Sequence, residues 1–154
     1  MTRTVTAAAL RAMLSDGGEL ALLDVREELL YSENHLLHAR SLPLSRLELR
    51  LEALVPRHGT RLVLCDGDEG LADRAAALIE SFGYCDVAVL AGGTKAWAEA
   101  AYVLFSGMNV PSKAFGEFIE HKAGTPSIAA EELHGLIDQG AQIVVLDSRP
   151  FDEY

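Results

Sequence analysis

Residues 61–72 decide the fold, and they read Arg61-Leu62-Val63-Leu64-Cys65-Asp66-Gly67-Asp68-Glu69-Gly70-Leu71-Ala72. An apolar run ends here in a short acidic loop that contains two glycines, and a helical pattern then begins. A strand, a tight loop and a helix N-terminus bring backbone N–H groups and the positive end of a helix dipole to one point. The function of the domain should therefore be decided in this loop.

The composition narrows the choice of partners. The chain has 154 residues, 49% of them hydrophobic, which suits one compact domain with additional chain. Its 13 Lys+Arg against 23 Asp+Glu give a net charge of −10, so nucleic acid and anionic membranes are poor candidates. No apolar run approaches the roughly 18 residues of a membrane span. We expect a cytoplasmic protein without a cofactor.

The two cysteines predict reduced thiols. Cys65 and Cys85 are too few for a disulfide framework or a zinc cluster. Cys85 precedes an apolar run and is expected to be structural. No metal site is expected in the chain.

Strands alternate with helices along residues 1–103. Continuous apolar runs at 20–23, 62–65 and 87–90 predict strands buried on both faces, with short extended pieces at Val5 and at 41–44. Ser45 and Glu48 form a possible capping box for a helix that reaches residue 55. This order predicts a doubly wound parallel α/β sheet. The other expected helices cover 7–14, 27–31, 71–82 and 94–100, and a later one covers 113–121.

The end of the chain repeats its beginning. Equivalent residues are separated by one offset without gaps (147 − 24 = 123 and 154 − 31 = 123), which indicates a tandem duplication. We expect a whole domain at 1–103, a connector with one helix at 104–125 and the start of a second domain at 126–154. The matching pairs are Val5 with Ile128, Leu10 with Leu133, Gly17 with Gly140, Asp24 with Asp147, Arg26 with Arg149 and Tyr31 with Tyr154.

Three motifs resemble the rhodanese (thiosulfate sulfurtransferase) family in its multi-domain form. The stretch from Asp24 to Glu27 is similar to the family's Asp-Val-Arg-Glu motif, and His35 and Ala39 stand near its Gly-His-Ile-x-Gly-Ala motif. The stretch 90–97 is close to Leu-x-Gly-Gly-x-x-x-Trp. The resemblance covers nearly all of the chain and implies a sheet of about five strands with helices on both faces.

The resemblance also implies a chemistry. In that family a cysteine opens the loop, and its thiolate attacks the outer sulfur of thiosulfate. The loop N–H groups and the helix dipole hold the resulting persulfide, and a thiophilic acceptor such as cyanide removes its sulfur. A basic residue at the end of the loop usually helps to bind the anion.

This loop departs from the family pattern. Counting back from Gly92 and Gly93 places the family's cysteine position on Asp66 and its arginine position on Leu71. Cys65 lies one residue early, so strand alternation turns its side chain away from the loop centre. The loop carboxylates repel a thiolate and thiosulfate alike. An aspartate here resembles the inactive first domains of tandem rhodaneses, so we expect no catalytic residue in the degenerate loop Asp66, Gly67, Asp68, Glu69, Gly70 and Leu71.

The remaining motif residues have structural interpretations. Asp24 and Arg26 are expected to form an ion pair that orients loops, and His35 is expected to be hydrogen-bonded in a loop. Gly92 and Gly93 predict a turn. Trp97 is expected to pack in the core, and Cys65 remains a weak candidate nucleophile.

Several functional hypotheses remain open. The longer protein is a sulfurtransferase in which this domain serves the following catalytic domain, or the domain is a non-enzymatic docking or regulatory module. The run from Leu62 to Asp68 also fits the start of haloacid-dehalogenase-like phosphatases, whose aspartate attacks phosphorus with Mg²⁺ bound, but no downstream motif follows. The expected partners are the following domain and thiosulfate, and the apolar segment 143–147 is a candidate for strand exchange.

Overall fold

The computed structural model describes residues 2–108, 110–124 and 126–147. It divides into two compact units, Met1–Ala114 and Phe115–Tyr154. The described residues of the first unit form a five-stranded parallel sheet in the order β1-β5-β4-β2-β3. The predicted α/β class and the number of strands are therefore confirmed. The strands are β1 Arg3–Val5, β2 Ala21–Asp24, β3 Arg40–Ser41, β4 Leu62–Cys65 and β5 Val87–Leu90.

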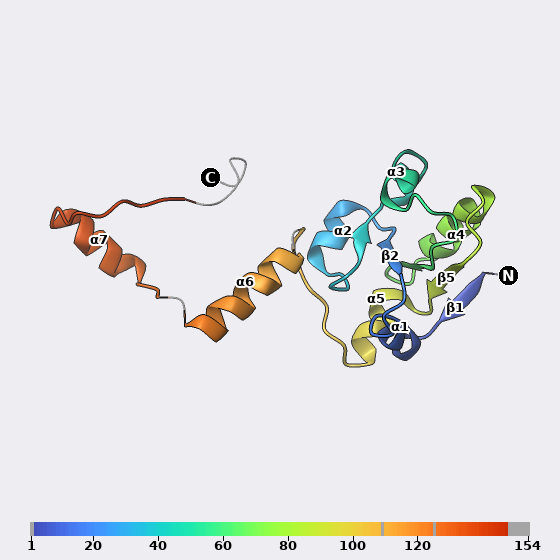
Figure 1. Ribbon diagram of the computed structural model, residues 1–154, viewed down its shortest axis with the longest axis horizontal. Coiled ribbons are helices and arrows are strands. Elements are labelled where there is room, and N and C mark those ends of the chain that lie inside the picture. Colours follow the sequence, from blue (N-terminus) through green and yellow to red (C-terminus); the bar gives the residue numbers. More distant parts are fainter. Residues whose placement is uncertain (1, 109, 125, 148–154) are drawn as a thin grey trace. The chain divides into compact units, whose positions relative to one another are not determined.

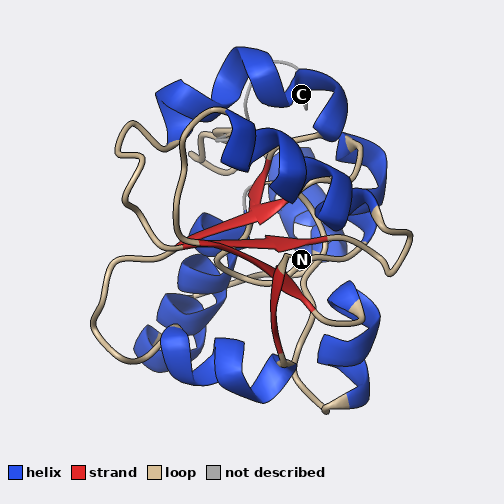
Figure 2. Ribbon diagram, turned by 90° about the vertical axis from the view of Figure 1, so that its right-hand side faces the viewer, coloured by secondary structure: helices blue, strands red, loops and turns tan. Residues whose placement is uncertain are grey.

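Helices cover both faces of this sheet, as Figures 1 and 2 show. One face packs against buried residues of α3 (Leu47–Leu54) and α4 (Leu71–Ser81). The other face packs against α1 (Ala7–Met13), α2 (Glu28–Glu33) and α5 (Gly93–Glu99). All four residues of β4 are buried, because a central parallel strand has no face toward water.

Two predicted helix ends behave differently from each other. The helix expected at 7–14 begins at Ala7, and Thr6 caps it, because the Thr6 hydroxyl accepts a hydrogen bond from the N–H of Ala9. The capping box at Ser45 and Glu48 is wrong. A 3-10 turn, η1 Leu44–Arg46, occupies that position, and α3 begins at Leu47 without a side-chain cap.

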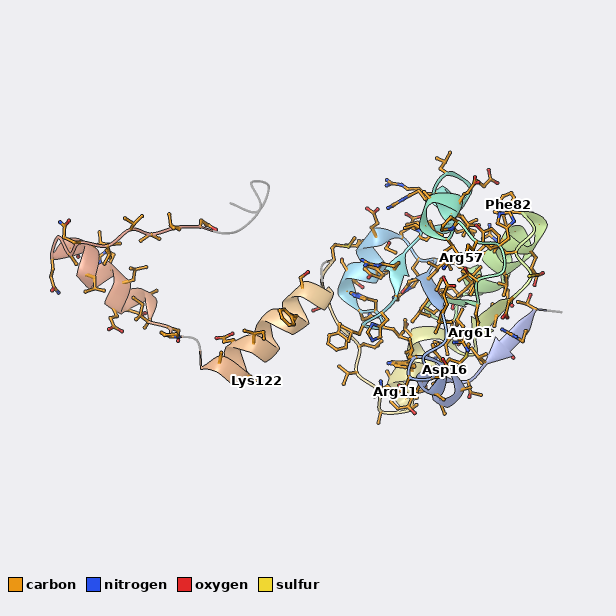
Figure 3. The ribbon with its side chains drawn as sticks, viewed as in Figure 1. Arg11, Asp16, Arg57, Arg61, Phe82 and Lys122 are labelled. Atoms are coloured by element: carbon orange, nitrogen blue, oxygen red, sulfur yellow. The ribbon has the colours of Figure 1, made fainter. Side chains whose placement is uncertain are left out.

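An ion pair fastens the start of β4 to the segment that follows α1. The guanidinium of Arg61 donates to both carboxylate oxygens of Asp16, at 2.8 and 3.0 Å, and Figure 3 shows the two side chains beside each other. Asp16 also accepts a hydrogen bond from the N–H of Gly18. This contact holds the turn that leads from α1 into β2.

The second unit contains helices α6 (Val110–Ala123, which begins in the first unit) and α7 (Ala130–Asp138). The helix predicted at 113–121 is thus longer. Pro111 fits in its first turn, because backbone N–H groups there have no partner within the helix and proline lacks this group. Residues 143–147 form no strand, and the Val144 and Leu146 side chains are more than four-fifths exposed. The repeat partners Arg149 and Tyr154 lie outside the described residues.

Candidate functional site

The loop between β4 and α4 is a cradle of backbone N–H groups, as its sequence predicts, but its own side chains fill it. Asp66 is buried, with 3% of its surface exposed. One carboxylate oxygen accepts from the N–H of Asp68 at 2.9 Å, and the other accepts from the N–H of Ala72 at 3.0 Å. Glu69 accepts a hydrogen bond from the N–H of Gly67. The donors that would hold a bound anion therefore already bond to carboxylates of the protein.

The conformation of the loop depends on two residues with positive φ. Asp68 has φ 82° and Gly70 has φ 77°, and the second is the N-cap of α4. Gly70 has no side chain, so it cannot cap the helix itself. The Asp66 carboxylate performs that function from four residues upstream (70 − 66 = 4) by accepting from Ala72.

A second turn presses against the loop. The Thr94 N–H donates to the Asp66 carbonyl oxygen at 2.8 Å, and Gly93 lies so close that a Cβ would be 2.3 Å from that oxygen. Glycine is thus required at Gly93, at the start of α5, by this close approach, and at both Gly92 and Gly93 by their positive φ values of 68° and 55°. Sequence reasoning predicted the glycine turn and missed its contact with Asp66, for which Thr94 offered no signal.

Cys65 ends β4 and is poorly placed for chemistry. It is fully buried and packs in the core cluster on the α1, α2 and α5 side of the sheet. Burial raises the pKa of its thiol well above the ordinary value, and the negative charges of Asp24 and Asp66 raise it further. The thiol is therefore neutral at physiological pH and has no route to a dissolved substrate.

The loop borders a surface cavity of about 260 Å³. Asp66, Asp68 and Asp73 all line it, and no lysine or arginine is among its described lining residues. Three carboxylates and no cation make an unfavourable electrostatic environment for an oxyanion.

Asp24 and Arg26 form the expected buried pair. The guanidinium of Arg26 donates to both carboxylate oxygens of Asp24, at 3.0 and 2.6 Å. It also donates to the backbone carbonyl oxygen of Asn34 at 2.6 Å. The pair thereby ties the end of β2 to the end of α2. Sequence reasoning missed this contact of Arg26 with Asn34.

His35 and Trp97 lie in the core. The His35 ring is fully buried, its Nδ1 lies 2.8 Å from the Tyr31 carbonyl oxygen, and it stacks on the Tyr31 ring. Burial lowers the pKa of His35. The Trp97 indole donates to the Val103 carbonyl oxygen at 3.1 Å and is 5% exposed. Neither side chain is among those that line the cavity at the loop.

The described residues contain no cluster of three or more His, Cys, Asp or Glu side chains arranged to hold a metal ion. The described helices include none with the length and apolar character needed to cross a bilayer.

Comparison with known proteins gives a consistent result. A family model described as "Rhodanese-like domain" matches residues 6–100. The crystal structure of thiosulfate sulfurtransferase from Pseudomonas aeruginosa is similar, with 51% identity and a TM-score of 0.88 over 99% of this chain. This chain spans only 29% of that protein's chain. No curated protein matches the sequence.

More distant structures share the fold alone. The Alr3790 protein from Anabaena sp. has 21% identity and a TM-score of 0.63, over 72% of this chain and 99% of that one. The BH2092 protein from Bacillus halodurans has 20% identity and a TM-score of 0.62, over 70% of this chain and 79% of that one. The family model and the 51% identical structure show that this chain belongs to the rhodanese family, and the Asp24–Arg26 pair and the Gly92–Gly93 turn agree with this.

Proposed function

We propose that this chain is the first part of a thiosulfate sulfurtransferase, and that its own rhodanese-like domain does not transfer sulfur. A cysteine in a later domain would carry the sulfur. The observation that supports this most directly is the Asp66 carboxylate, which stands at the nucleophile position and bonds to the N–H groups of Asp68 and Ala72. The domain would then shape and support the following domain, with thiosulfate as the donor substrate of the longer protein.

The proposed transfer requires a thiolate in the cradle. The thiolate attacks the outer sulfur of thiosulfate, the S–S bond of thiosulfate breaks, and sulfite leaves with the bonding electron pair. Cyanide then attacks the outer persulfide sulfur, which yields thiocyanate and restores the thiolate. This domain offers no thiolate for the first half of the reaction and therefore no persulfide for the second, because Asp66 has no sulfur and the Cys65 thiol is buried and protonated.

Two observations support a second copy of the domain after residue 125. Helix α7 begins at Ala130 and α1 begins at Ala7, so the helices start at the offset of the repeat (130 − 7 = 123). Gly17 and Gly140 share that offset and both have positive φ, 76° and 67°. On this proposal, the first domain spans 1–103, the connector spans 104–125 and the start of the second domain spans 126–154. The strands and helices that would pack on the start of the second domain follow in the longer chain.

A thiosulfate:cyanide sulfurtransferase assay tests the proposal on two proteins, the 154-residue chain and the longer chain. We expect no activity in the first and activity in the second. Activity in the 154-residue chain that disappears in Cys65→Ser would overturn the proposal. An inactive longer chain would favour the alternative, a non-enzymatic docking or regulatory module.

A gain-of-function series tests the role of the loop directly. Asp66→Cys places a thiol in the cradle, and Asp66→Cys with Glu69→Gln also removes the second carboxylate. After treatment with thiosulfate, mass spectrometry detects a protein heavier by one sulfur atom. We expect more persulfide in the double variant than in the single variant, and none in Glu69→Gln alone. Equal persulfide in the unmodified chain would contradict the assignment of Asp66 to the nucleophile position.

A further inference from the structure

A second cavity lies at the opposite edge of the sheet from β1, beside the edge strand β3. Its volume is about 340 Å³, within the range of pockets that bind small molecules. Its lining comes from β3, from α2 and α3, and from the segment after Phe105, all within the first unit. None of its described lining residues belongs to the loop at 65–72. The lining residues are Tyr31, Arg40, Ser41, Arg50, Leu54 and Met108.

Two arginines without partners line this cavity. Among the described residues, Arg40 and Arg50 have no ion pair and no side-chain hydrogen bond. Five other arginines of the first unit bond to carboxylates: Arg3, Arg26, Arg46, Arg57 and Arg61. Two like charges beside one cavity repel each other unless an anion lies between them. In a chain of net charge −10, two arginines that line one cavity and have no carboxylate partner among the described residues are unusual.

The hydroxyl of Ser41 provides a second observation at the same cavity. Its Oγ is enclosed and has no hydrogen-bond partner. Enclosed hydroxyl groups in folded proteins normally have a partner, so an unpaired one at a cavity wall is a donor available to a ligand. The Tyr31 hydroxyl donates to the Ala39 carbonyl oxygen at 2.8 Å and forms no hydrogen bond with Ser41 Oγ.

The rest of the wall is apolar. The Tyr31 ring and the side chains of Leu54 and Met108 line the cavity beside the two arginines. Arg40 is close enough to act electrostatically on the Tyr31 phenol. Burial raises the pKa of this phenol, and the positive charge of Arg40 acts in the opposite direction. A bare inorganic anion would leave most of this wall uncovered, whereas an anion with an apolar body would cover it.

We propose that this cavity is a binding site for a small organic anion. Its carboxylate or phosphate group lies between the guanidinium groups of Arg40 and Arg50 and accepts a hydrogen bond from Ser41 Oγ. Guanidinium groups suit this role because their planar donors match the oxygens of both head groups. The apolar body of the ligand packs on Tyr31, Leu54 and Met108. The site is separate from the proposed sulfur-transfer chemistry and does not depend on it.

Titrations of the ¹⁵N-labelled 154-residue chain test the site, with phenyl phosphate and benzoate as the two head-group probes. Inorganic phosphate lacks the apolar body, and phenol lacks the charge. We expect saturable amide shifts around Arg40, Ser41 and Arg50 with at least one of the organic anions, and weaker binding of both comparison compounds. Whichever organic anion binds more tightly identifies the head group.

Three variants and a control locate the binding. Arg40→Gln and Arg50→Gln should each weaken it about tenfold or more, the loss expected for a charged hydrogen-bonding partner. Ser41→Ala should weaken it several-fold. Arg74→Gln changes another exposed arginine that has no partner among the described residues and is not in this lining, so it should leave the affinity unchanged.

Specific results would overturn the proposal. The first is the absence of a saturable shift with either organic anion, and the second is a set of shifts centred on another part of the domain. The third is an equal loss of affinity in Arg74→Gln and in the cavity variants. Both cavity arginines are exposed, so the variants should fold, and their unperturbed spectra check this. These measurements involve no sulfur transfer, so their failure is distinguishable from failure of the proposed function.

Discussion

At the residue scale, the Asp66 side chain stabilises the loop between β4 and α4. Its carboxylate accepts from the N–H groups of Asp68 and Ala72, so it supplies the negative charge that the cradle favours. A cysteine at this position would supply that charge as a thiolate or persulfide, which can react. On the proposed function, the loop keeps its geometry without the sulfur chemistry.

The first prediction concerns that carboxylate. Asp66→Ala leaves two backbone N–H groups without a protein partner and removes the cap of α4. We expect a loss of about 1–2 kcal/mol in the free energy of unfolding, the usual cost of a lost N-terminal cap. Urea denaturation measures it. The control Asp73→Ala removes an exposed carboxylate of the same helix turn, and a loss equal to that of Asp66→Ala would refute the capping role.

The second prediction concerns pH. Hydrogen bonds from Arg61 and Gly18 lower the pKa of Asp16 from 3.8 to about 2. Because the folded-state pKa lies below the unfolded value, the ionised carboxylate stabilises the fold above about pH 4, and this stabilisation is lost as the pH falls toward 2.

Asp16→Asn should therefore make the melting temperature less sensitive to pH between about 4 and 2. Thermal melts of both proteins at several pH values measure this difference. Glu99→Gln changes an exposed carboxylate without an ion pair among the described residues, and it should leave the acid sensitivity unchanged. Parallel pH curves for Asp16→Asn and the original protein would argue against the assignment.

At the scale of elements, the candidate site consists of two turns in direct contact. The β4–α4 loop and the β5–α5 turn meet where the Asp66 carbonyl oxygen accepts from the Thr94 N–H. Neighbouring parallel strands bring their carboxyl ends to one edge of the sheet, and β4 and β5 are such neighbours. The contact therefore follows from strand order, and Gly93 allows the approach.

The third prediction separates contact from backbone strain. Gly70→Ala and Gly93→Ala both place a side chain at positive φ, but only at Gly93 would the new Cβ meet another atom closely, 2.3 Å from the Asp66 carbonyl oxygen. We expect a destabilisation of about 1 kcal/mol for Gly70→Ala and about 3 kcal/mol for Gly93→Ala. Chemical denaturation of both variants measures the difference, and equal values would show that the close approach has no energetic importance.

At the scale of the whole molecule, residues paired by the offset of 123 differ in burial. Leu22 and Leu23 of β2 are buried, whereas Val145 and Leu146, their equivalents at the offset of 123, are exposed. An exposed apolar segment of this kind is prone to pair with another chain. This is why we retain strand exchange through 143–147 as a proposal.

The fourth prediction compares a chain that ends at Gly124 with the chain that ends at Tyr154. If residues 126–154 belong to a second domain, their removal should leave the melting temperature of the first domain unchanged within about 2 °C, the shift of a sub-kcal/mol effect. Light scattering after size-exclusion chromatography measures the association state of both. Association of the chain that ends at Tyr154, without association of the chain that ends at Gly124, would support strand exchange. Monomeric behaviour of both chains would contradict it.

Local pattern was sufficient for much of the fold. The continuous apolar runs predicted β4 and β5 with their observed ends, because a strand buried on both faces is typically a continuous run of apolar residues. The start of α3 was predicted wrongly. A capping box at Ser45 and a 3-10 turn at Leu44–Arg46 both suit this sequence locally, and packing of the buried Leu47 and Leu51 accompanies the second.

The sequence alone determined the family and the parallel α/β fold, because both follow from motifs of adjacent residues. The family resemblance assigns Asp66 to the nucleophile position. Only the tertiary structure decided where the loop N–H groups point and that Asp66 and Glu69 already occupy them. It alone placed Gly93 against the Asp66 carbonyl oxygen, and it brought Arg40, Ser41 and Arg50 to one cavity. The physical reason is that spacing along the chain determines local conformation, whereas contacts between segments depend on strand order and on how closely two backbones approach.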